Sequence, residues 1–125
     1  MPLKPLYIKN NYKLPDFRFD PQTGELKIIK RSIPENAYDT FAPAIKWIEE
    51  YLENPQKETK LIIDLDYLNS ATIKVLTYII NLLNKADNTN LTVLWYYSDE
   101  DTEDICLDVK TITKADIKVI SKMQD

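Results

Sequence analysis

The clearest candidate for chemistry in this chain is a serine hydroxyl between an apolar run and an amphipathic stretch. The apolar run, residues 61–65, is β-branched in its middle and has the length of a buried strand. From Ile73 onward, apolar residues recur at three- and four-residue steps, the spacing of one helix face. Asn69 and Ser70 lie between the two patterns, and both are good helix N-cap residues, since a short side-chain oxygen accepts from free first-turn amides. The sequence therefore predicts a strand, a tight turn and a helix, with a hydroxyl at the helix's positive end.

Ser70 has two interpretations. In the first, Ser70 or Asn69 only caps the helix, and the pattern alone favours this because capping serines are common. In the second, Ser70 is a phosphorylation switch. A phosphoryl group at a helix N-terminus is stabilised by the free amides and the helix dipole, and it changes the local charge by about −1.5 to −2.

Two acidic features offer other chemistry. Asp64 and Asp66 flank Leu65 on the predicted strand and point to one face, so they are candidates for a carboxylate pair in acid–base catalysis, or they lie on an exposed half of the strand. The acidic run at residues 99–104 contains oxygen ligands for a divalent cation. It lacks the spacing of an EF-hand loop, and a solvated helix start that matches the dipole explains it better.

The composition excludes several classes of function. The chain has no histidine, which removes Ser-His and Cys-His catalysis and histidine metal ligands, and Gly24 is its only glycine, which removes a glycine-rich phosphate loop. The formal net charge of −4 argues against nucleic acid as the main partner. Cys106 has no cysteine to pair with, which fits a reducing cytoplasm. No signal peptide or membrane-spanning run is visible, so we expect no membrane partner, and nothing indicates a cofactor.

The predicted elements before the central strand are an edge segment, a hairpin and a helix. Residues 1–15 carry three prolines and form an edge segment with a short strand at 6–9. Residues 16–31 form a β-hairpin around the turn at 20–24. A helix then spans about 36–53, with Ser32 and Glu35 spaced as a capping box. Pro43 should kink this helix or split it.

The elements after the central strand and helix complete an alternating pattern. Alternating apolar residues predict a strand at 91–97, and Ser98 is the expected N-cap of an acidic helix that contains Cys106 as a core residue. A last strand covers 117–121. Strands that alternate with helices imply parallel pairing and right-handed crossovers. The sequence thus predicts one α/β domain over 1–125, with a mixed sheet, an N-terminal hairpin and about three helices.

Three segments, in this order, resemble the SiaC-type bacterial regulatory phosphoproteins, which are small STAS-like domains. The segments read FDPQTGELKIIKRSIPENAYDTFAPAIKWIEEYL, YLNSATIKVL and LTVLWYY, the last followed by an acidic stretch. The resemblance covers about residues 16–120. It implies a partner switch in which a cognate kinase phosphorylates a hydroxyl in the strand-to-helix turn and a PP2C-type phosphatase reverses the reaction. The unphosphorylated form would bind and activate a diguanylate cyclase that influences biofilm formation.

The resemblance also assigns residues. The family's turn, Tyr-x-Asn-Thr-Ser-Ser, aligns with residues 67–72, so its phosphorylated threonine falls on Ser70, while Ala71 replaces a second hydroxyl. Asn69 and Thr72 would shape the turn and, with a second family motif, border the partner surface; that motif comprises Arg31, Ser32, Pro34, Glu35 and Asn36. Two departures concern loop shape: Lys30 stands where the family often has glycine, and no glycine follows near Asp108.

With the resemblance included, the switch becomes the preferred interpretation of Ser70, in a protein without catalytic activity of its own. The alternative is a non-catalytic STAS-like domain that binds a nucleotide or another small molecule near the same turn. An enzyme that uses Asp64 or Asp66 ranks below both, because no second convergent group can be named.

Overall fold

The computed structural model describes residues 2–11 and 13–122, which form six strands and three helices. The strands are β1 (Leu6–Ile8), β2 (Asp16–Asp20), β3 (Glu25–Ser32), β4 (Glu58–Leu68), β5 (Asn90–Tyr97) and β6 (Ile117–Ser121). The helices are α1 (Ala37–Tyr51), α2 (Ser70–Asn84) and α3 (Glu100–Thr113). No helix within these residues is long and apolar enough to cross a membrane.

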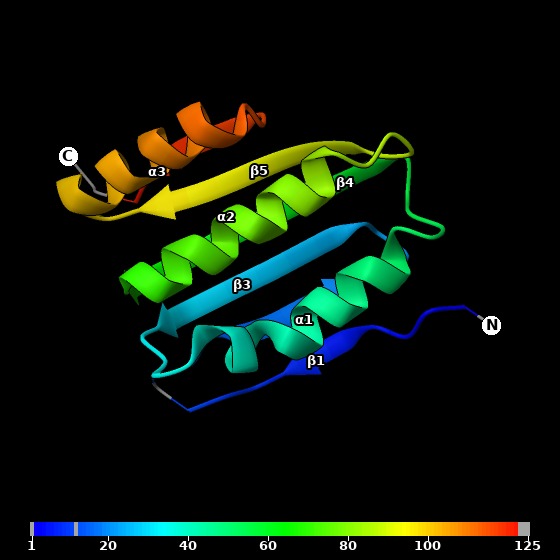
Figure 1. The fold of residues 1–125 in the computed structure, drawn as a ribbon, viewed down its shortest axis with the longest axis horizontal. Coiled ribbons are helices and arrows are strands. Elements are labelled where there is room, and N and C mark those ends of the chain that lie inside the picture. Colours follow the sequence, from blue (N-terminus) through cyan, green and yellow to red (C-terminus); the bar gives the residue numbers. More distant parts are fainter. Residues whose placement is uncertain (1, 12, 123–125) are drawn as a thin grey trace.

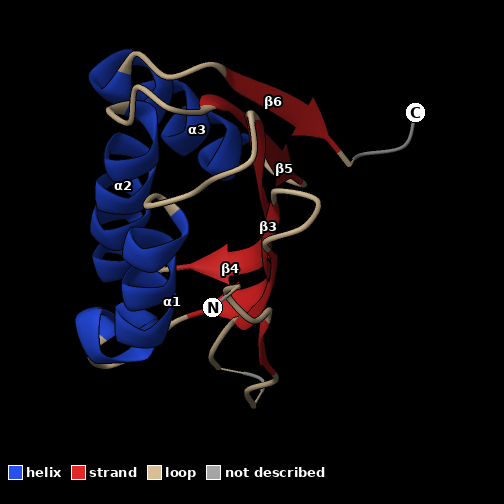
Figure 2. Ribbon diagram, turned by 90° about the vertical axis from the view of Figure 1, so that its right-hand side faces the viewer, coloured by secondary structure: helices blue, strands red, loops and turns tan. Residues whose placement is uncertain are grey.

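The six strands form one mixed sheet in sequence order, β1 to β6. β1, β2 and β3 pair antiparallel, whereas β3, β4, β5 and β6 pair parallel. One helix connects each parallel pair, and all three helices cover the same face of the sheet (Figures 1 and 2). The predicted hairpin, parallel pairing and α/β class are confirmed. Because the crossovers repeat, the carboxyl ends of β3, β4 and β5 and the starts of α1, α2 and α3 share one edge of the molecule.

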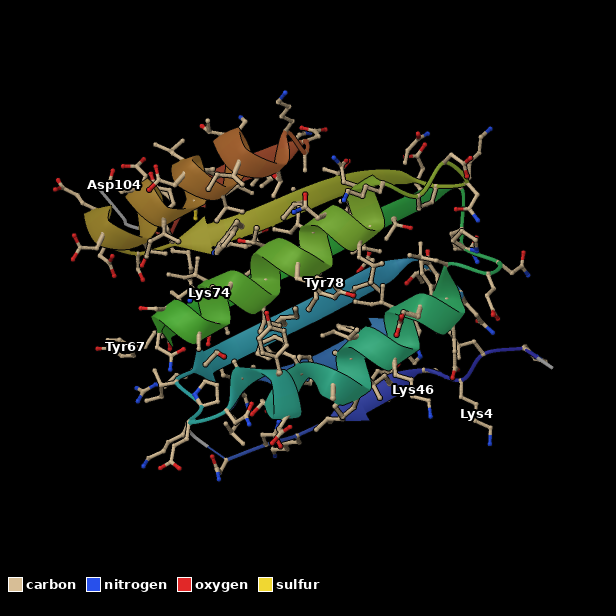
Figure 3. The ribbon with its side chains drawn as sticks, in the orientation of Figure 1. Lys4, Lys46, Tyr67, Lys74, Tyr78 and Asp104 are labelled. Atoms are coloured by element: carbon tan, nitrogen blue, oxygen red, sulfur yellow. The ribbon has the colours of Figure 1, made fainter. Side chains whose placement is uncertain are left out.

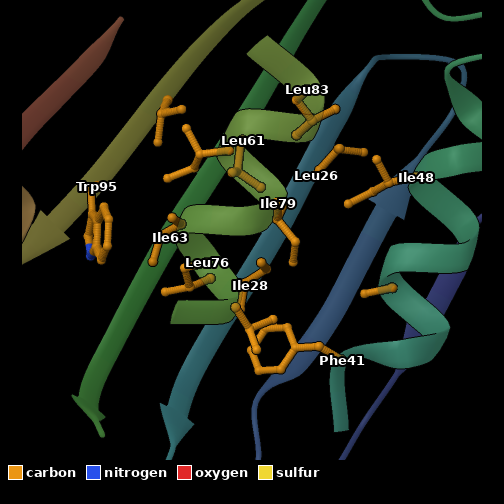
Figure 4. Packing of buried hydrophobic residues seen from close by; sticks show 14 of the residues in the cluster. Leu26, Ile28, Phe41, Ile48, Leu61, Ile63, Leu76, Ile79, Leu83 and Trp95 are labelled. Carbon is orange, nitrogen blue, oxygen red and sulfur yellow. The ribbon is translucent and has the colours of Figure 1, made fainter. Parts of the chain in front are cut away.

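The core lies between the sheet and the helices, and strand alternation selects its members. Leu26 and Ile28 of β3 point to this side together with Leu61 and Ile63 of β4 (Figure 4). Their neighbours in the chain face the other side, as the alternating burial along both strands shows. The helices contribute fully buried side chains, including Phe41, Ile48, Leu76, Ile79 and Leu83. Burying each such side chain stabilises the fold by about 1.5–3 kcal/mol, so this layer holds the shared edge in place.

Helix α1 differs from the sequence-based expectations at its N-cap and at Pro43. Asn36 is the N-cap: its side-chain oxygen accepts from the amide of Asp39 at 3.2 Å. The expected Ser32–Glu35 capping box is wrong, because Ser32 is the last residue of β3 and is fully buried. Pro43 lies inside one continuous helix and does not split it. Pro43 is exposed, so its ring does not displace core side chains, although it removes one helical hydrogen bond.

Helix α3 also begins one residue later than expected. Asp99, not Ser98, is the N-cap, and its carboxylate accepts from the amide of Thr102 at 2.7 Å. A carboxylate is preferred there because it accepts the hydrogen bond and also carries charge that the helix dipole favours. Three more acidic residues follow in the first turn, so the acidic run is a helix start.

A bulge near the end of β3 contains a strained residue. Lys30 has φ = 86°, in the region that favours glycine, and the pairing of β3 with β4 shifts register between Lys30 and Arg31. The Lys30 ammonium lies 2.8 Å from a carboxylate oxygen of Asp16, whose side chain is almost fully buried. The backbone amide of Asn10 donates to the other oxygen at 3.0 Å. An ion pair thus anchors a bulge whose backbone conformation favours glycine.

The Asp16 contacts predict a specific loss of stability in acid. Burial alone would raise the pKa of Asp16, but the Lys30 hydrogen bond, the Asn10 amide and the positive charges of Lys30 and Arg18 outweigh it and lower the pKa. A lowered folded-state pKa means that the stabilisation is complete above the unfolded value of about 4 and is lost as the pH falls below it. We therefore expect Asp16→Asn to be less stable than wild type at pH 7, with the gap narrowing below about pH 4.

Urea unfolding between pH 3 and pH 8 measures this gap. Asp87→Asn, in the exposed loop after α2, is the control and should show no such pH-dependent gap. A gap for Asp16→Asn that is the same at pH 3 and pH 7 would contradict the role given to the Lys30–Asp16 pair.

Candidate functional site

Ser70 is the first residue of α2, and its side chain is exposed. The cap is its neighbour: the side-chain oxygen of Asn69 accepts from the amide of Thr72 at 3.0 Å. The sequence left open which of the two residues caps the helix, and the structure assigns the cap to Asn69. The Ser70 hydroxyl makes no hydrogen bond to the described part of the chain, so it is free for other chemistry.

The start of α2 also carries an uncompensated positive end. The amides of Ser70 and Ala71 belong to the first turn and have no acceptor within the helix. The first turn of α2 contains no acidic residue, whereas α1 has Asp39 and α3 has three carboxylates at the same position. A dianion on Ser70 would therefore interact favourably with the helix dipole, because no carboxylate in this first turn already offsets that dipole.

A buried hydroxyl network holds the turn below Ser70. The Thr72 hydroxyl lies 2.8 Å from the Ser32 hydroxyl, 2.9 Å from the Ser32 carbonyl and 2.7 Å from the Asn69 side-chain oxygen. Because Thr72 has one hydroxyl proton, it donates to one of the two oxygen acceptors and accepts from Ser32. Both Ser32 and Thr72 are completely buried. They stabilise the turn from inside the core, and in this conformation neither side chain reaches the surface.

The two segments assigned from the resemblance lie side by side. The Asn69 amide donates to the Ser32 carbonyl at 3.1 Å, and the Asn69 side-chain amide donates to the Pro34 carbonyl at 3.0 Å. The guanidinium of Arg31 lies 5.0 Å from the centroid of the Tyr67 ring, in cation–π geometry. Residues 31–36 and 67–72 therefore form one surface at the edge where α2 begins, with Tyr67 projecting from it (Figure 3).

The remaining members of the second motif divide into buried and exposed positions. Pro34 is buried, Glu35 and Asn36 are exposed, and Arg31 is half-buried. Asn36 is engaged as the cap of α1, so its side chain has a structural task. Glu35 and Arg31 are the members of this motif whose charged groups reach the surface.

Three exposed residues at this edge were not identified as site residues from the sequence. Ile33 lies inside the second motif but was not assigned a role, and Tyr67 was only an alignment anchor. Lys74 is one helical turn after Ser70, so its ammonium lies on the same side of α2. The four-residue spacing of Ser70 and Lys74 could have identified Lys74 from sequence, whereas the surface position of Ile33 and Tyr67 depends on packing.

The other candidate sites lack a convergent constellation. Asp64 is bound by the Lys122 ammonium at 2.9 Å, and this hydrogen bond raises the pKa of Lys122 against the opposing effect of burial. No group of three or more carboxylates or thiols in residues 2–11 and 13–122 could hold a metal ion. Burial raises the pKa of the Cys106 thiol to about 12, which makes it an unreactive core residue, as expected.

A surface depression of about 600 Å³ lies away from Ser70. It is formed by the turn between β2 and β3, the end of α1 and the residues before β4, at the opposite edge of the sheet. A ligand in this depression would not touch the turn at residues 67–72. The depression therefore gives no support to a small-molecule site near Ser70.

The hydroxyl network predicts the effect of one substitution on stability. Thr72→Val keeps the side-chain shape but leaves Ser32 without its hydroxyl partner inside the core, which should lower the free energy of unfolding by about 1–3 kcal/mol. Thr92→Val, on the uncovered face of β5, is the control and should change stability by less than about 0.5 kcal/mol. Urea denaturation of the three proteins measures this, and equal stability of Thr72→Val and wild type would disprove the network's structural role.

Comparison with known proteins places this geometry in a family. Over 94 residues, 74% of this chain and 75% of the other, the chain is 33% identical to an uncharacterised protein of Pseudomonas aeruginosa strain UCBPP-PA14. The crystal structure of apo-SiaC from Pseudomonas aeruginosa matches with a TM-score of 0.84 and 26% identity, covering 94% of this chain and 98% of that one.

A second solved structure shows what SiaC assembles with. It contains the diguanylate cyclase SiaD in complex with its activator SiaC, also from Pseudomonas aeruginosa, and it matches with a TM-score of 0.84 and 26% identity over 93% of this chain and 98% of that one. The model of the SiaC family regulatory phosphoproteins matches residues 8–122, nearly the whole sequence. The six-stranded sheet, the serine at the start of α2 and these matches together show that the chain belongs to the SiaC family of regulatory phosphoproteins.

Proposed function

We propose that this protein is a phosphorylation-controlled regulator whose unphosphorylated form binds and activates a diguanylate cyclase. The family match and the complex of SiaC with the cyclase SiaD support the class of partner. In this proposal a cognate kinase adds phosphate to Ser70 and a PP2C-type phosphatase removes it. The protein has no catalytic role of its own, and the cytoplasm is the expected compartment.

The proposal rests on one observation: the side chains of three neighbouring residues have different roles and different exposure. Asn69 caps the helix, Thr72 is buried and hydrogen-bonded, and Ser70 stands between them with an exposed, unbonded hydroxyl. Ala71 has no hydroxyl. Of the serine and threonine hydroxyls in the described residues 67–72, Ser70 is therefore the one that a kinase could reach and modify without opening the core.

Phosphorylation would act through charge at this position. A phosphoryl group adds about −1.5 to −2 charges and three acceptor oxygens. The free amides of Ser70 and Ala71 and the ammonium of Lys74 would stabilise it. The modified turn would then present a negative surface to a partner that binds the neutral hydroxyl form.

Treatment with the cognate kinase and ATP, followed by mass spectrometry, tests the assignment of the acceptor. Wild type and Ser70→Thr should each gain one phosphate at position 70, and Thr72→Val should still be modified there. Ser70→Ala should gain none. Phosphate on another residue of wild type, or undiminished phosphorylation of Ser70→Ala, would show that the acceptor is wrong.

A further inference from the structure

We propose that the cyclase docks on a small apolar patch formed by Ile33 and Tyr67, and that the docking segment of the cyclase is apolar with a carboxylate that reaches Arg31 or Lys74. This inference rests on the proposed function and specifies the surface through which it would act. In this inference Ile33 and Tyr67 contact the partner, and the buried motif residues Ser32 and Thr72 do not.

Exposure distinguishes the two patch residues from their neighbours. Tyr67 is 60% exposed and Ile33 is 38% exposed, although both are large and apolar. Ser32 and Pro34, which flank Ile33 in the chain, are buried. Aromatic residues that stand on a rigid support are frequent centres of binding energy, because little conformational freedom is lost when a partner covers them.

The support under the patch is held by hydrogen bonds on both sides. The amide of Ile33 donates to the Lys13 carbonyl at 2.9 Å, while Asn69 binds the carbonyls of Ser32 and Pro34. Tyr67 lies at the end of β4, where its backbone pairs with Arg31 of β3. The patch therefore belongs to the same rigid unit as the turn that carries Ser70.

Two exposed or half-buried cations, Arg31 against the Tyr67 ring and Lys74 one turn into α2, lack carboxylate partners among the described residues. No carboxylate oxygen of residues 2–11 and 13–122 forms an ion pair with Arg31 or Lys74, in a chain whose net charge is −4. Asp66 is the nearest acidic residue in β4, and its charge helps to raise the pKa of Lys122, which lies at the uncovered face of the sheet. An apolar contact with unpaired cations at its rim is complementary to an apolar segment that carries a carboxylate.

This surface explains why phosphate would oppose binding. A dianion on Ser70, three residues after Tyr67, would have to lose water when an apolar segment covers the patch, which is costly. It would also compete with the partner's carboxylate for Arg31 and Lys74. Both effects act only when phosphate is present, so the neutral hydroxyl form is the binding form.

Isothermal titration of the diguanylate cyclase from the same organism tests the patch. We expect Tyr67→Ala and Ile33→Ala each to raise the Kd at least about tenfold. Tyr67→Phe keeps the ring over which Arg31 lies and should bind within about twofold of wild type. Tyr78→Ala and Ile112→Ala are matched controls, because these residues are 45% and 68% exposed but lie on other parts of α2 and α3, and they should also bind within about twofold. Circular dichroism confirms that each variant is folded.

The outcomes separate this inference from the function on which it rests. If wild type does not bind the cyclase, the proposed function and the patch both fail. If wild type binds and phosphorylation weakens binding, but Tyr67→Ala and Ile33→Ala bind like the controls, only the patch fails. If the patch variants lose binding and phosphorylation has no effect, the patch stands and the switch is wrong.

Discussion

Ser70→Glu is expected to raise the Kd for the cyclase at least about tenfold, while Ser70→Ala stays within about twofold of wild type. The glutamate places a carboxylate at the uncompensated start of α2, beside the Ile33–Tyr67 patch, where a docked partner would remove it from water. Alanine removes only a hydroxyl that makes no hydrogen bond to the described residues. Because glutamate carries one charge and phosphate nearly two, the glutamate effect is a lower bound on that of phosphorylation.

Ser98→Glu is the matched control for this charge. Ser98 is also exposed and also lies next to a helix start, that of α3, but outside the segments 31–36 and 67–72. It should leave the Kd within about twofold of wild type. Isothermal titration at one salt concentration compares the four proteins, and equal weakening by Ser70→Glu and Ser98→Glu would mean that binding responds to net charge and not to this turn.

Gly24→Val is expected to lower the free energy of unfolding by about 3 kcal/mol or more, the largest effect on stability that we predict. Gly24 has φ = 74°, which a β-branched residue rarely adopts, and a Cβ at this position would lie 2.5 Å from the backbone carbonyl oxygen of Glu58. The turn cannot move away easily, since the Gly24 carbonyl accepts from the amide of Lys60 at 2.8 Å. Both the turn and the start of β4 would have to shift.

Gln22→Ala, in the same turn but exposed, is the control and should change stability by less than about 0.5 kcal/mol. Urea denaturation monitored by circular dichroism measures both variants. A loss below about 1 kcal/mol for Gly24→Val would show that the turn adapts and that the close approach to Glu58 is not important for stability.

The order of the elements was readable from sequence because local periodicity is strong in this chain. The hairpin around Gly24, the alternation in β5 and the helical spacing from Ile73 each have a period that packing reinforces. The caps of α1 and α3 were harder to predict, since several adjacent residues have suitable side chains. Asn36 and Asp99 were selected by where the preceding strand ends, and this depends on pairing with distant residues.

Only part of the site could be predicted from the sequence, because its remaining contacts join residues that are far apart in the chain. The serine at the start of α2 follows from local pattern, but the contact between Ser32 and Thr72 spans 40 residues and depends on parallel pairing of β3 with β4. The family resemblance pointed to residues 31–36 without proving that they adjoin the turn. The hydrogen bonds from Asn69 to Ser32 and Pro34 supply that adjacency. Which residues of the motif face outward required the three-dimensional packing.

The most direct test uses protein prepared with phosphoserine incorporated at position 70 and compares it with the unmodified chain in one cyclase assay. We expect the unmodified protein to bind the diguanylate cyclase and raise its rate of product formation, and the phosphoserine form to do neither at the same concentration. If the two forms bind and activate the cyclase equally, Ser70 is not the switch of this protein.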